Sequence, residues 1–336
     1  MALATLKSTL KSFVYEAGLL GWLHRRRNGD ALTVFMFHRV LPRDSAAYTQ
    51  AEKEFTFTVD GFGRCLDFID KHYSVVTAQQ VKAALDGGTD LPPCPALITF
   101  DDGWRDTLVH AYPALHERKL PALVFLATEI MESPHPDWWQ DLLVQTLEQP
   151  ERAASLLRQL GLPEAYARER SRETDHEVAG KVASLPLTQR LELLTALLPE
   201  SGGGQQMLTE VEVSAADRSC LEFGGHGHTH APLTTVFEPL LELRKSHDFV
   251  SSLKPSVATM SFPHGAYTQQ LLDLTETAGF ELSFTSDPTL LDLRAPGKGR
   301  RIGRIHVPEN EWTTQEGKIS FPKLATFLFF RPRASS

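Results

Sequence analysis

Cysteine is scarce in this chain, and its scarcity excludes two common ways of holding a small fold together. The 336 residues contain three cysteines, Cys65, Cys94 and Cys220, which lie far apart and form no CxxC pair. A disulfide framework and a cysteine-based zinc site are therefore not expected. This cysteine usage fits a reducing compartment, so we expect a cytoplasmic location, although the usage is also compatible with export.

Long apolar runs and clustered cations are missing as well. No stretch of roughly 18 consecutive apolar residues occurs, so a membrane-spanning helix is not expected. A clear signal peptide is absent, because Glu16 interrupts the apolar run near the N-terminus and three arginines, residues 25–27, follow where small residues should stand. The net charge of -8, without a long Lys/Arg run, argues against a nucleic-acid partner, since neutralising phosphates requires clustered cations.

Residues 1–28 have the pattern of one amphipathic helix. Apolar side chains recur there at helical spacing, at Leu3, Leu6, Leu10, Phe13, Val14, Ala17 and Leu20. We interpret this segment as a helix packed on the body of the protein. A peripheral contact with the inner membrane is the alternative, and Trp22 and the arginine triplet favour it.

Strand-like and helix-like segments alternate over residues 29–310. The expected strands are residues 32–37, 73–76, 96–100, 122–126, 221–224, 258–262, 281–285 and 304–307. Repeated alternation predicts an α/β fold with a parallel sheet or barrel, in which chemistry lies at the C-terminal strand ends. Residues from about 140 to 205 contain no strand-like run. We predict that they form a helical insertion without metal ligands or a catalytic base, and that residues 311–336 form a C-terminal tail.

Two adjacent carboxylates follow the expected strand 96–100. Asp101 and Asp102 repel each other at a strand end, and this repulsion costs stability unless a cation or a proton relieves it. Gly103 then permits a sharp backbone turn. In isolation an Asp-Asp-Gly sequence predicts only a turn. The buried strand that precedes it makes a solvated hairpin turn less natural and favours a functional pair.

Three histidines lie within five residues of a glycine-rich segment, at His226, His228 and His230. Imidazole is the commonest protein ligand for divalent metals of borderline softness. One helical turn between His226 and His230 would place both rings on one face. A solvated polar loop with incidental histidines is the alternative. Apolar strand and helix patterns flank the segment closely and favour a metal site, to which the carboxylate pair would add the third ligand.

Together these segments resemble the polysaccharide deacetylase family, also called the NodB-homology family or carbohydrate esterase family four. Residues 99–103 (TFDDG) match its first motif without departure. Residues 226–230 match its metal-binding histidine motif, with Gly227 where the family usually has Ser or Thr. Residues 262–265 (FPHG) resemble its third motif, although Ser261 stands where the commoner version has an arginine.

Three further segments are similar to the bacterial exopolysaccharide-type members of that family. They are residues 34–40 (VFMFHRV), the pair Trp138 and Trp139, and residues 304–307 (RIHV). The resemblance thus spans about residues 30–310, and it implies a distorted (β/α) barrel of the NodB type with a helical insertion. It also implies a hydrolase acting on linear amides, specifically a deacetylase whose substrate is an acetylated oligosaccharide or polysaccharide.

The resemblance further implies a set of site residues. The metal ligands would be Asp102, His226 and His230, with zinc as the first choice and cobalt, nickel or iron as alternatives. Asp101 would be the general base, and the backbone N–H of His264 would stabilise the oxyanion. The implied general acid is His38, with His306 as its rival, and His228 is expected to be a loop residue rather than a ligand. Expected substrate contacts are Trp138, Trp139 and Arg304, and Arg304 is also a candidate to replace the missing arginine that orients Asp101.

Other functions remain open at this point. Members of the same family hydrolyse cyclic amides or O-acetyl esters, and the sequence does not separate these reactions from N-deacetylation. A non-catalytic carbohydrate-binding relative is a different class, against which the intact Asp101, Asp102, His226 and His230 argue. A membrane-associated scaffold that uses the N-terminal helix is a third class, and it is compatible with catalysis.

Overall fold

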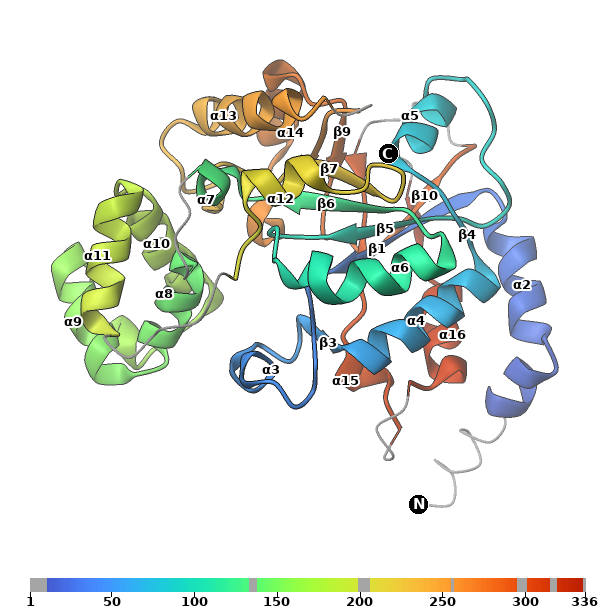
Figure 1. The fold of residues 1–336 in the computed structure, drawn as a ribbon, viewed down its shortest axis with the longest axis horizontal. Coiled ribbons are helices and arrows are strands. Elements are labelled where there is room, and N and C mark those ends of the chain that lie inside the picture. Colours follow the sequence, from blue (N-terminus) through green and yellow to red (C-terminus); the bar gives the residue numbers. More distant parts are fainter. Residues whose placement is uncertain are drawn as a thin grey trace.

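A mostly parallel β-sheet forms the centre of the protein (Figure 1). The computed structural model describes residues 11–132, 138–198, 206–254, 257–294, 301–314 and 319–334. The strands of the large sheet are β1 (Ala31–Phe37), β4 (Ser74–Val75), β5 (Pro95–Phe100), β6 (Ala122–Leu126), β7 (Leu221–Gly225), β8 (Thr259–Ser261), β9 (Leu282–Phe284), β10 (Leu290–Asp292), β11 (Arg301–Ile302), β12 (Ile305–His306) and β13 (Arg333–Ala334). A small parallel pair, β2 (Arg39–Leu41) and β3 (Thr56–Thr58), lies beyond the end of β1.

The strand order explains both the predicted barrel and its incompleteness. The sheet runs in the order β11-β9-β8-β7-β6-β5-β1, and β12 pairs in parallel with β1. The two ends of this ladder, β11 and β12, are separated in the chain only by Gly303 and Arg304. No pairing joins β11 to β12 among the described residues. The predicted α/β fold with a parallel sheet is therefore confirmed, while hydrogen-bonded closure into a barrel is not.

Each face of the sheet packs against a separate hydrophobic core, because alternate side chains of a strand point to opposite faces. Phe35, Ile98 and Val124 belong to the larger core, whereas their neighbours Val34 and Leu97 belong to a smaller one. Burial on both faces explains why these strands read as nearly continuous apolar runs in the sequence. The predicted strands 32–37, 96–100 and 122–126 correspond to β1, β5 and β6.

Helices flank the sheet and form many of the connections between its parallel strands. Near β1 and β5 lie α4 (Val59–His72) and α6 (Tyr112–Arg118), and beside β7 lie α13 (Pro239–Ser252) and α14 (Gln269–Ala278) (Figure 1). The predicted N-cap Thr77 begins α5 (Ala78–Leu85), where its side chain accepts from the Gln80 backbone and forms a capping box. Shorter elements are α3 (Ala46–Gln50), η1 (Thr107–Ala111), α7 (Thr128–Glu132), α12 (Glu210–Ala215), η3 (Pro263–Gly265) and α15 (Glu309–Trp312).

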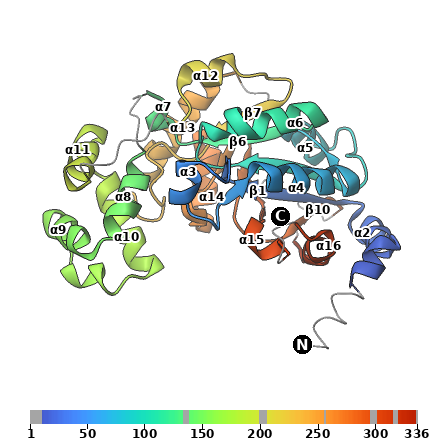
Figure 2. The same ribbon diagram turned by 60° about the horizontal axis from the view of Figure 1, so that its bottom comes forward.

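The predicted insertion is a lobe of helices beside the sheet (Figures 1 and 2). It contains α8 (Trp139–Leu147), α9 (Pro150–Leu160), η2 (Glu164–Ala167), α10 (Arg172–Ala183) and α11 (Leu187–Leu197). Its helical character is confirmed over residues 138–198, whereas its predicted end at residues 199–205 lies outside the described residues. The buried Arg190 joins the lobe to the sheet side of the molecule, because its Nη1 lies 2.6 Å from the Glu129 carboxylate on α7.

Both ends of the chain differ from the sequence prediction. Residues 311–336 are not a tail, since α16 (Phe321–Phe329) buries Leu324 and Leu328, and β13 pairs with β10. At the N-terminus, residues 1–10 lie outside the described part. Gly18, with φ 75°, separates the helical residues 11–16 from α2 (Leu19–Asn28). The single predicted helix is therefore interrupted.

The helix α2 packs on the body of the protein through its buried side. The Asn28 side chain donates to the Phe329 carbonyl at 2.8 Å, and the His24 ring stacks on Phe329 with centroids 4.1 Å apart. Trp22 on the same helix is 50% exposed, so the peripheral membrane contact stays a prediction. None of the helices in the described ranges is long and apolar enough to cross a membrane.

Candidate metal and hydrolase site

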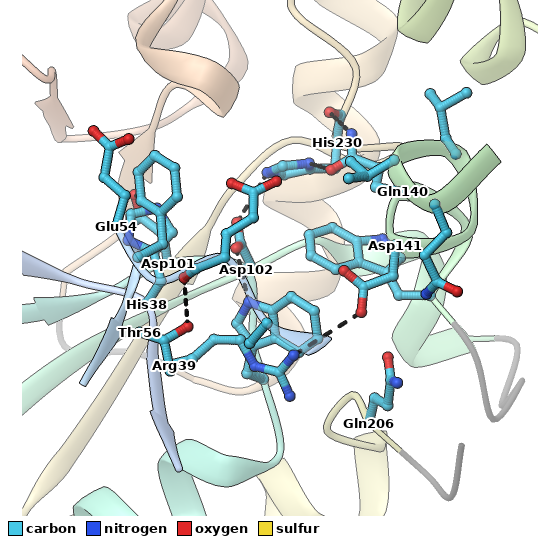
Figure 3. A pocket seen from close by; sticks show the side chains of 18 of the residues that line it. His38, Arg39, Glu54, Thr56, Asp101, Asp102, Gln140, Asp141, Gln206 and His230 are labelled. Atoms are coloured by element: carbon cyan, nitrogen blue, oxygen red, sulfur yellow. Dashed lines mark hydrogen bonds and ion pairs between the residues drawn. The ribbon is translucent and has the colours of Figure 1, made fainter. Parts of the chain in front are cut away.

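A large cavity opens where the C-terminal ends of the central strands meet the helical insertion. Its volume is about 1810 Å³. Its lining includes Asp101 and Asp102 from the strand side, Glu52 from the loop around α3, and Asp141 and His176 from the insertion. The cavity therefore brings together segments that are far apart in the sequence. Figure 3 shows Asp102 near its centre, with His38 on one side and Gln140 on the other.

The aspartate pair stands on a tight turn directly after β5. Asp102 has φ 76° and Gly103 has φ 83°, so two successive residues occupy a region that side chains rarely adopt. A Cβ atom on Gly103 would lie 3.0 Å from the Leu126 side chain, which explains why a glycine is needed here. The Trp104 indole N–H donates to Asp102 Oδ2 at 2.9 Å and leaves Oδ1 directed at the histidines.

The histidine segment is a loop rather than the helical turn suggested by the spacing. Residues 226–230 follow β7 without helical structure, and Gly227 and His230 have φ of 73° and 61°. Glu242 on α13 holds this loop in place, because its Oε1 accepts from the backbone N–H groups of His228 and Thr229 at 2.9 and 2.6 Å. The helical turn is therefore wrong, but both rings still face Asp102, at 3.3 Å from His226 Nε2 and 3.0 Å from His230 Nε2.

Hydrogen bonds at Nδ1 orient both candidate ligand rings. His226 Nδ1 lies 2.9 Å from the Ser261 carbonyl oxygen, which can only accept, so Nδ1 carries the proton. His230 Nδ1 contacts Oε1 of Gln140 in the same way. Both Nε2 atoms are then left with a lone pair that points into the site. Such outer hydrogen bonds are the usual support of metal-binding histidines.

Asp102, His226 and His230 fit a divalent cation. Asp102 Oδ1 lies 3.0 Å from His230 Nε2 and 3.3 Å from His226 Nε2. His230 Nε2 is buried and has no hydrogen-bond partner within the part of the chain that the structure describes. Two lone pairs facing a carboxylate oxygen repel it unless a positive charge lies between them. Within the described residues, no other group of three such side chains could hold a metal ion.

The pKa values of Asp102 and His226 also indicate that the site favours a positive charge. Burial alone raises the pKa of Asp102, but the neighbouring His230 and His226 rings hold it well below its usual value. Burial lowers the pKa of His226, and the charges of Asp101 and Asp102 raise it above its usual value. Both shifts arise from attraction between opposite charges in the site, and a bound cation would supply the positive charge in place of a proton.

Asp101 is held beside this group by the buried Arg304. The guanidinium Nη1 and Nη2 lie 2.6 and 2.8 Å from the two carboxylate oxygens of Asp101. Burial raises the pKa of Asp101, yet the charge of Arg304 brings it below the usual value, so the carboxylate stays ionised. The Arg304 side chain is 0% exposed, so its predicted substrate contact is wrong. It has the contact expected for the arginine that orients Asp101.

The two candidates for the general acid lie side by side. His38, directly after β1, has Nε2 4.0 Å from Asp101 Oδ2, and its ring centroid is 6.0 Å from that of His306. His306 donates from Nε2 to the Glu54 carbonyl at 3.1 Å. Burial lowers the pKa of His38 to about 4. Both rings line the cavity, but only His38 contacts the Asp101 carboxylate.

The remaining predicted residues divide between the cavity and the protein interior. His264 lies in η3 with φ 57° and lines the cavity. Trp138 also lines it and packs edge-on against His230, with centroids 4.9 Å apart. Trp139 does not line the cavity and packs against the Arg190 guanidinium, so its predicted role as a sugar platform is wrong. His228 bonds Thr128 Oγ1 at 3.0 Å, away from the ligand group, as expected for a loop residue.

Sequence reasoning missed the residues that support the site. Gln140, Trp104 and Glu242 each bond a ligand or the loop that carries it. Arg39 is another, because its Nε lies 2.9 Å from Asp106 and its guanidinium lies over the Trp104 ring at 3.7 Å. Gln140 and Trp104 stand next to recognised motifs, which was the one available signal. Their partners lie too far away in the sequence for any local pattern to show them.

A comparison with known protein families finds one family whose model covers part of the site. The sequence model of the family described as polysaccharide deacetylase matches residues 89–191, which include Asp101 and Asp102. A search of curated proteins finds no match. The resemblance to this family is therefore confirmed, over less than half of the chain.

Three solved structures are similar to this chain, and two of them are named as a deacetylase and a de-N-acetylase. The Streptococcus pyogenes deacetylase PplD in complex with acetate has 16% identity and a TM-score of 0.52, over 83% of this chain and 93% of that one. A de-N-acetylase from Aggregatibacter actinomycetemcomitans has 14% identity and a TM-score of 0.54, over 89% and 100%. IcaB from Ammonifex degensii has 19% identity and a TM-score of 0.51, over 90% and 98%. At these identities the likeness shows a shared fold.

Proposed function

Since the chain matches the polysaccharide deacetylase family and has its fold, we propose that it is a metal-dependent hydrolase that removes N-acetyl groups from a glycan or glycan precursor. The observation that carries this proposal is the position of Asp102 Oδ1, which lies 3.0 and 3.3 Å from two histidine nitrogens, beside a second carboxylate. Two nitrogens and one oxygen with open positions form the ligand pattern of hydrolytic metal sites.

Asp102, His226 and His230 would hold the cation, and zinc is the first choice among metals that suit imidazole and carboxylate. When bound, such an ion lowers the pKa of a water that it holds and polarises a carbonyl oxygen. Asp102 contributes one negative charge and the two neutral rings contribute none. The site therefore keeps a net positive charge when a divalent cation is present, which favours attack on a neutral amide.

Asp101 would take the proton of the attacking water. Arg304 keeps this carboxylate ionised and fixes its plane, with Oδ2 3.9 Å from His226 Nε2 and therefore directed at the metal site. A carboxylate held by one arginine still has free lone pairs that can accept a proton. The backbone N–H of His264, in the turn after β8, is the proposed donor to the developing oxyanion.

His38 would return a proton to the leaving amine. Its pKa of about 4 means that the ring is neutral before the reaction and must receive its proton during the reaction. Asp101, 4.0 Å away, is the group that acquires a proton at that stage. The His306 ring is less suited, because its Nε2–H is engaged by the Glu54 carbonyl.

Amide and ester substrates distinguish these two histidines. We expect His38→Ala to lower turnover of an N-acetyl substrate far more than that of an activated acetyl ester, because a good leaving group needs little protonation. Metal content should not change. Equal impairment on both substrates, or a larger amide-selective loss in His306→Ala, would move the general-acid role away from His38.

The cavity favours an oligosaccharide over a small molecule. Small-ligand sites usually have volumes of roughly 300–1,000 Å³, whereas this cavity has about 1810 Å³ and extends between the insertion and the loop around α3. Its lining is rich in polar and charged side chains, such as Glu52, Arg39 and Asp141, which suit hydroxyl groups. A cyclic amide would leave most of this space unfilled.

Acetate release from paired substrates tests the proposed function. Purified protein is incubated with oligosaccharides that have the same backbone and carry either N-acetyl or O-acetyl groups, and with a cyclic imide. We expect acetate from the N-acetyl substrates. Turnover of the cyclic imide alone would support the alternative hydrolase. Binding to the glycan without any turnover would support a non-catalytic carbohydrate-binding protein.

A further inference from the structure

We propose that Gln140 is a positioning residue through which the helical insertion holds the metal ligand His230, so that metal binding and docking of the insertion are coupled. This inference rests on the metal site of the proposed function. It assigns a role to the insertion, which the sequence alone predicts to be without ligands or a catalytic base. It therefore concerns how the metal site is kept in order rather than the reaction itself.

Gln140 makes two hydrogen bonds to a single residue. Its amide Nε2 donates to the His230 carbonyl oxygen at 3.0 Å, and its Oε1 contacts Nδ1 of the same histidine. Gln140 is the second residue of α8, at the point where the insertion leaves the sheet side of the molecule. Figure 3 shows the two side chains facing each other at the edge of the cavity.

The chemistry of the His230 carbonyl fixes the orientation of this amide. A carbonyl oxygen accepts and never donates, so the NH₂ group of Gln140 must face it. The amide oxygen then faces Nδ1, and this places the ring proton on Nδ1. Nε2 is left unprotonated and directed at Asp102 Oδ1, at 3.0 Å. Gln140 thus selects the tautomer that can bind a metal.

The hydrogen bonds from Gln140 also stabilise the backbone conformation of His230. Its φ of 61° lies in a region that is unfavourable for a non-glycine residue and persists only where neighbours enforce it. The bond from Gln140 to the His230 carbonyl is one such constraint. The Trp138 ring, edge-on against the imidazole with centroids 4.9 Å apart, is another from the same end of the insertion.

The insertion is anchored independently of the metal site. Arg190, 1% exposed, donates to the carbonyls of Ala183 and Leu185 and pairs with Glu129. The helices of the lobe are therefore held in place by contacts other than those that Gln140 makes. If docking of the lobe improves metal affinity, metal binding must stabilise the docked lobe by the same free energy, because coupling between two equilibria is reciprocal.

The metal affinity of three variants tests the proposed role of Gln140. Gln140→Leu keeps the size of the side chain and removes both hydrogen bonds to His230, together with a 3.3 Å contact between the Gln140 amide and His264 Nε2. We expect it to bind Zn²⁺ about 10- to 100-fold more weakly than wild type, the usual cost of losing an outer partner of a metal ligand. Gln140→Glu keeps an acceptor for the Nδ1–H, so its affinity should stay within a few-fold of wild type. Gln189→Leu, at an exposed position on α11, is the matched control and should bind as wild type does.

Hydrogen exchange supplies a readout that does not depend on activity. In wild-type protein, adding Zn²⁺ should slow amide exchange in α8, and in Gln140→Leu this protection should be reduced. Should the leucine variant fold poorly, Gln140→Asn replaces it, because its shorter side chain cannot keep both contacts. Wild-type affinity and protection in Gln140→Leu or Gln140→Asn, or an equal loss in Gln189→Leu, would overturn the coupling. Absence of Zn²⁺ binding by wild type would overturn the proposed function itself.

Discussion

Replacing Asp101 by asparagine should lower turnover by about 100- to 10,000-fold, the usual contribution of a general base, while the metal stays bound. The amide has the shape of the carboxylate but cannot take the proton of the attacking water. Asp101 is not one of the three proposed ligands, and its oxygens are bonded to Arg304 rather than to the metal group. Initial rates and metal content are measured on the same preparation.

A second buried ion pair in the cavity provides the control for that variant. Asp106 is also buried and paired with an arginine, Arg39, at 2.9 Å. Asp106→Asn therefore removes a comparable carboxylate without removing the proposed base. Because Asp106 supports Arg39 and the Val40 backbone and takes no proton in the reaction, this variant should lose far less activity than Asp101→Asn. Near-normal turnover in Asp101→Asn, or an equal loss in both variants, would mean that the roles of the two adjacent aspartates are wrongly assigned.

Replacing His226 by alanine should remove the bound metal. Wild-type protein is expected to hold about one divalent ion per chain, as three protein ligands with open positions typically do. With His226 replaced, only Asp102 and His230 remain, and the repulsion that the cation relieved is reduced as well. Elemental analysis after gel filtration should therefore find little metal in the variant. Full occupancy in this variant would contradict the ligand assignment.

The same loop offers a control of the same residue type. His228 lies between the two proposed ligands in the sequence, but its ring bonds Thr128 Oγ1 at 3.0 Å and is not part of the metal group. His228→Ala should keep its metal. Loss of metal in both variants would indicate a general collapse of the loop rather than loss of a ligand.

Much of the fold could be predicted because the central strands carry a strong local signal. β1, β5 and β6 are buried on both faces, so each is an almost continuous apolar run. The residues that begin the helix after Thr77 were also predictable, since a capping box uses side chains three positions apart. The C-terminal helix α16 was missed, because its burial depends on α2 at the other end of the chain.

The candidate site was predictable where residue type alone signals chemistry. Adjacent aspartates after a buried strand and three histidines among glycines are unusual whatever surrounds them. The supporting contacts were not predictable in this way. Gln140 bonds a residue 90 positions away, and Arg304 bonds one 203 positions away, so only the folded chain shows which partner each has. The two tryptophans at the start of the insertion illustrate the same limit, since both are buried and only Trp138 lines the cavity.

Acetate release by one preparation, measured before chelation, after chelation and after Zn²⁺ is restored, tests the central claim most directly. The substrate is an N-acetylated oligosaccharide, and the Gln189→Leu protein is treated in parallel as a handling control. We predict that chelation abolishes acetate release and that the restored ion recovers most of it in both proteins. Unchanged acetate release from metal-free protein would contradict the claim that Asp102, His226 and His230 form the centre of a metal-dependent deacetylase.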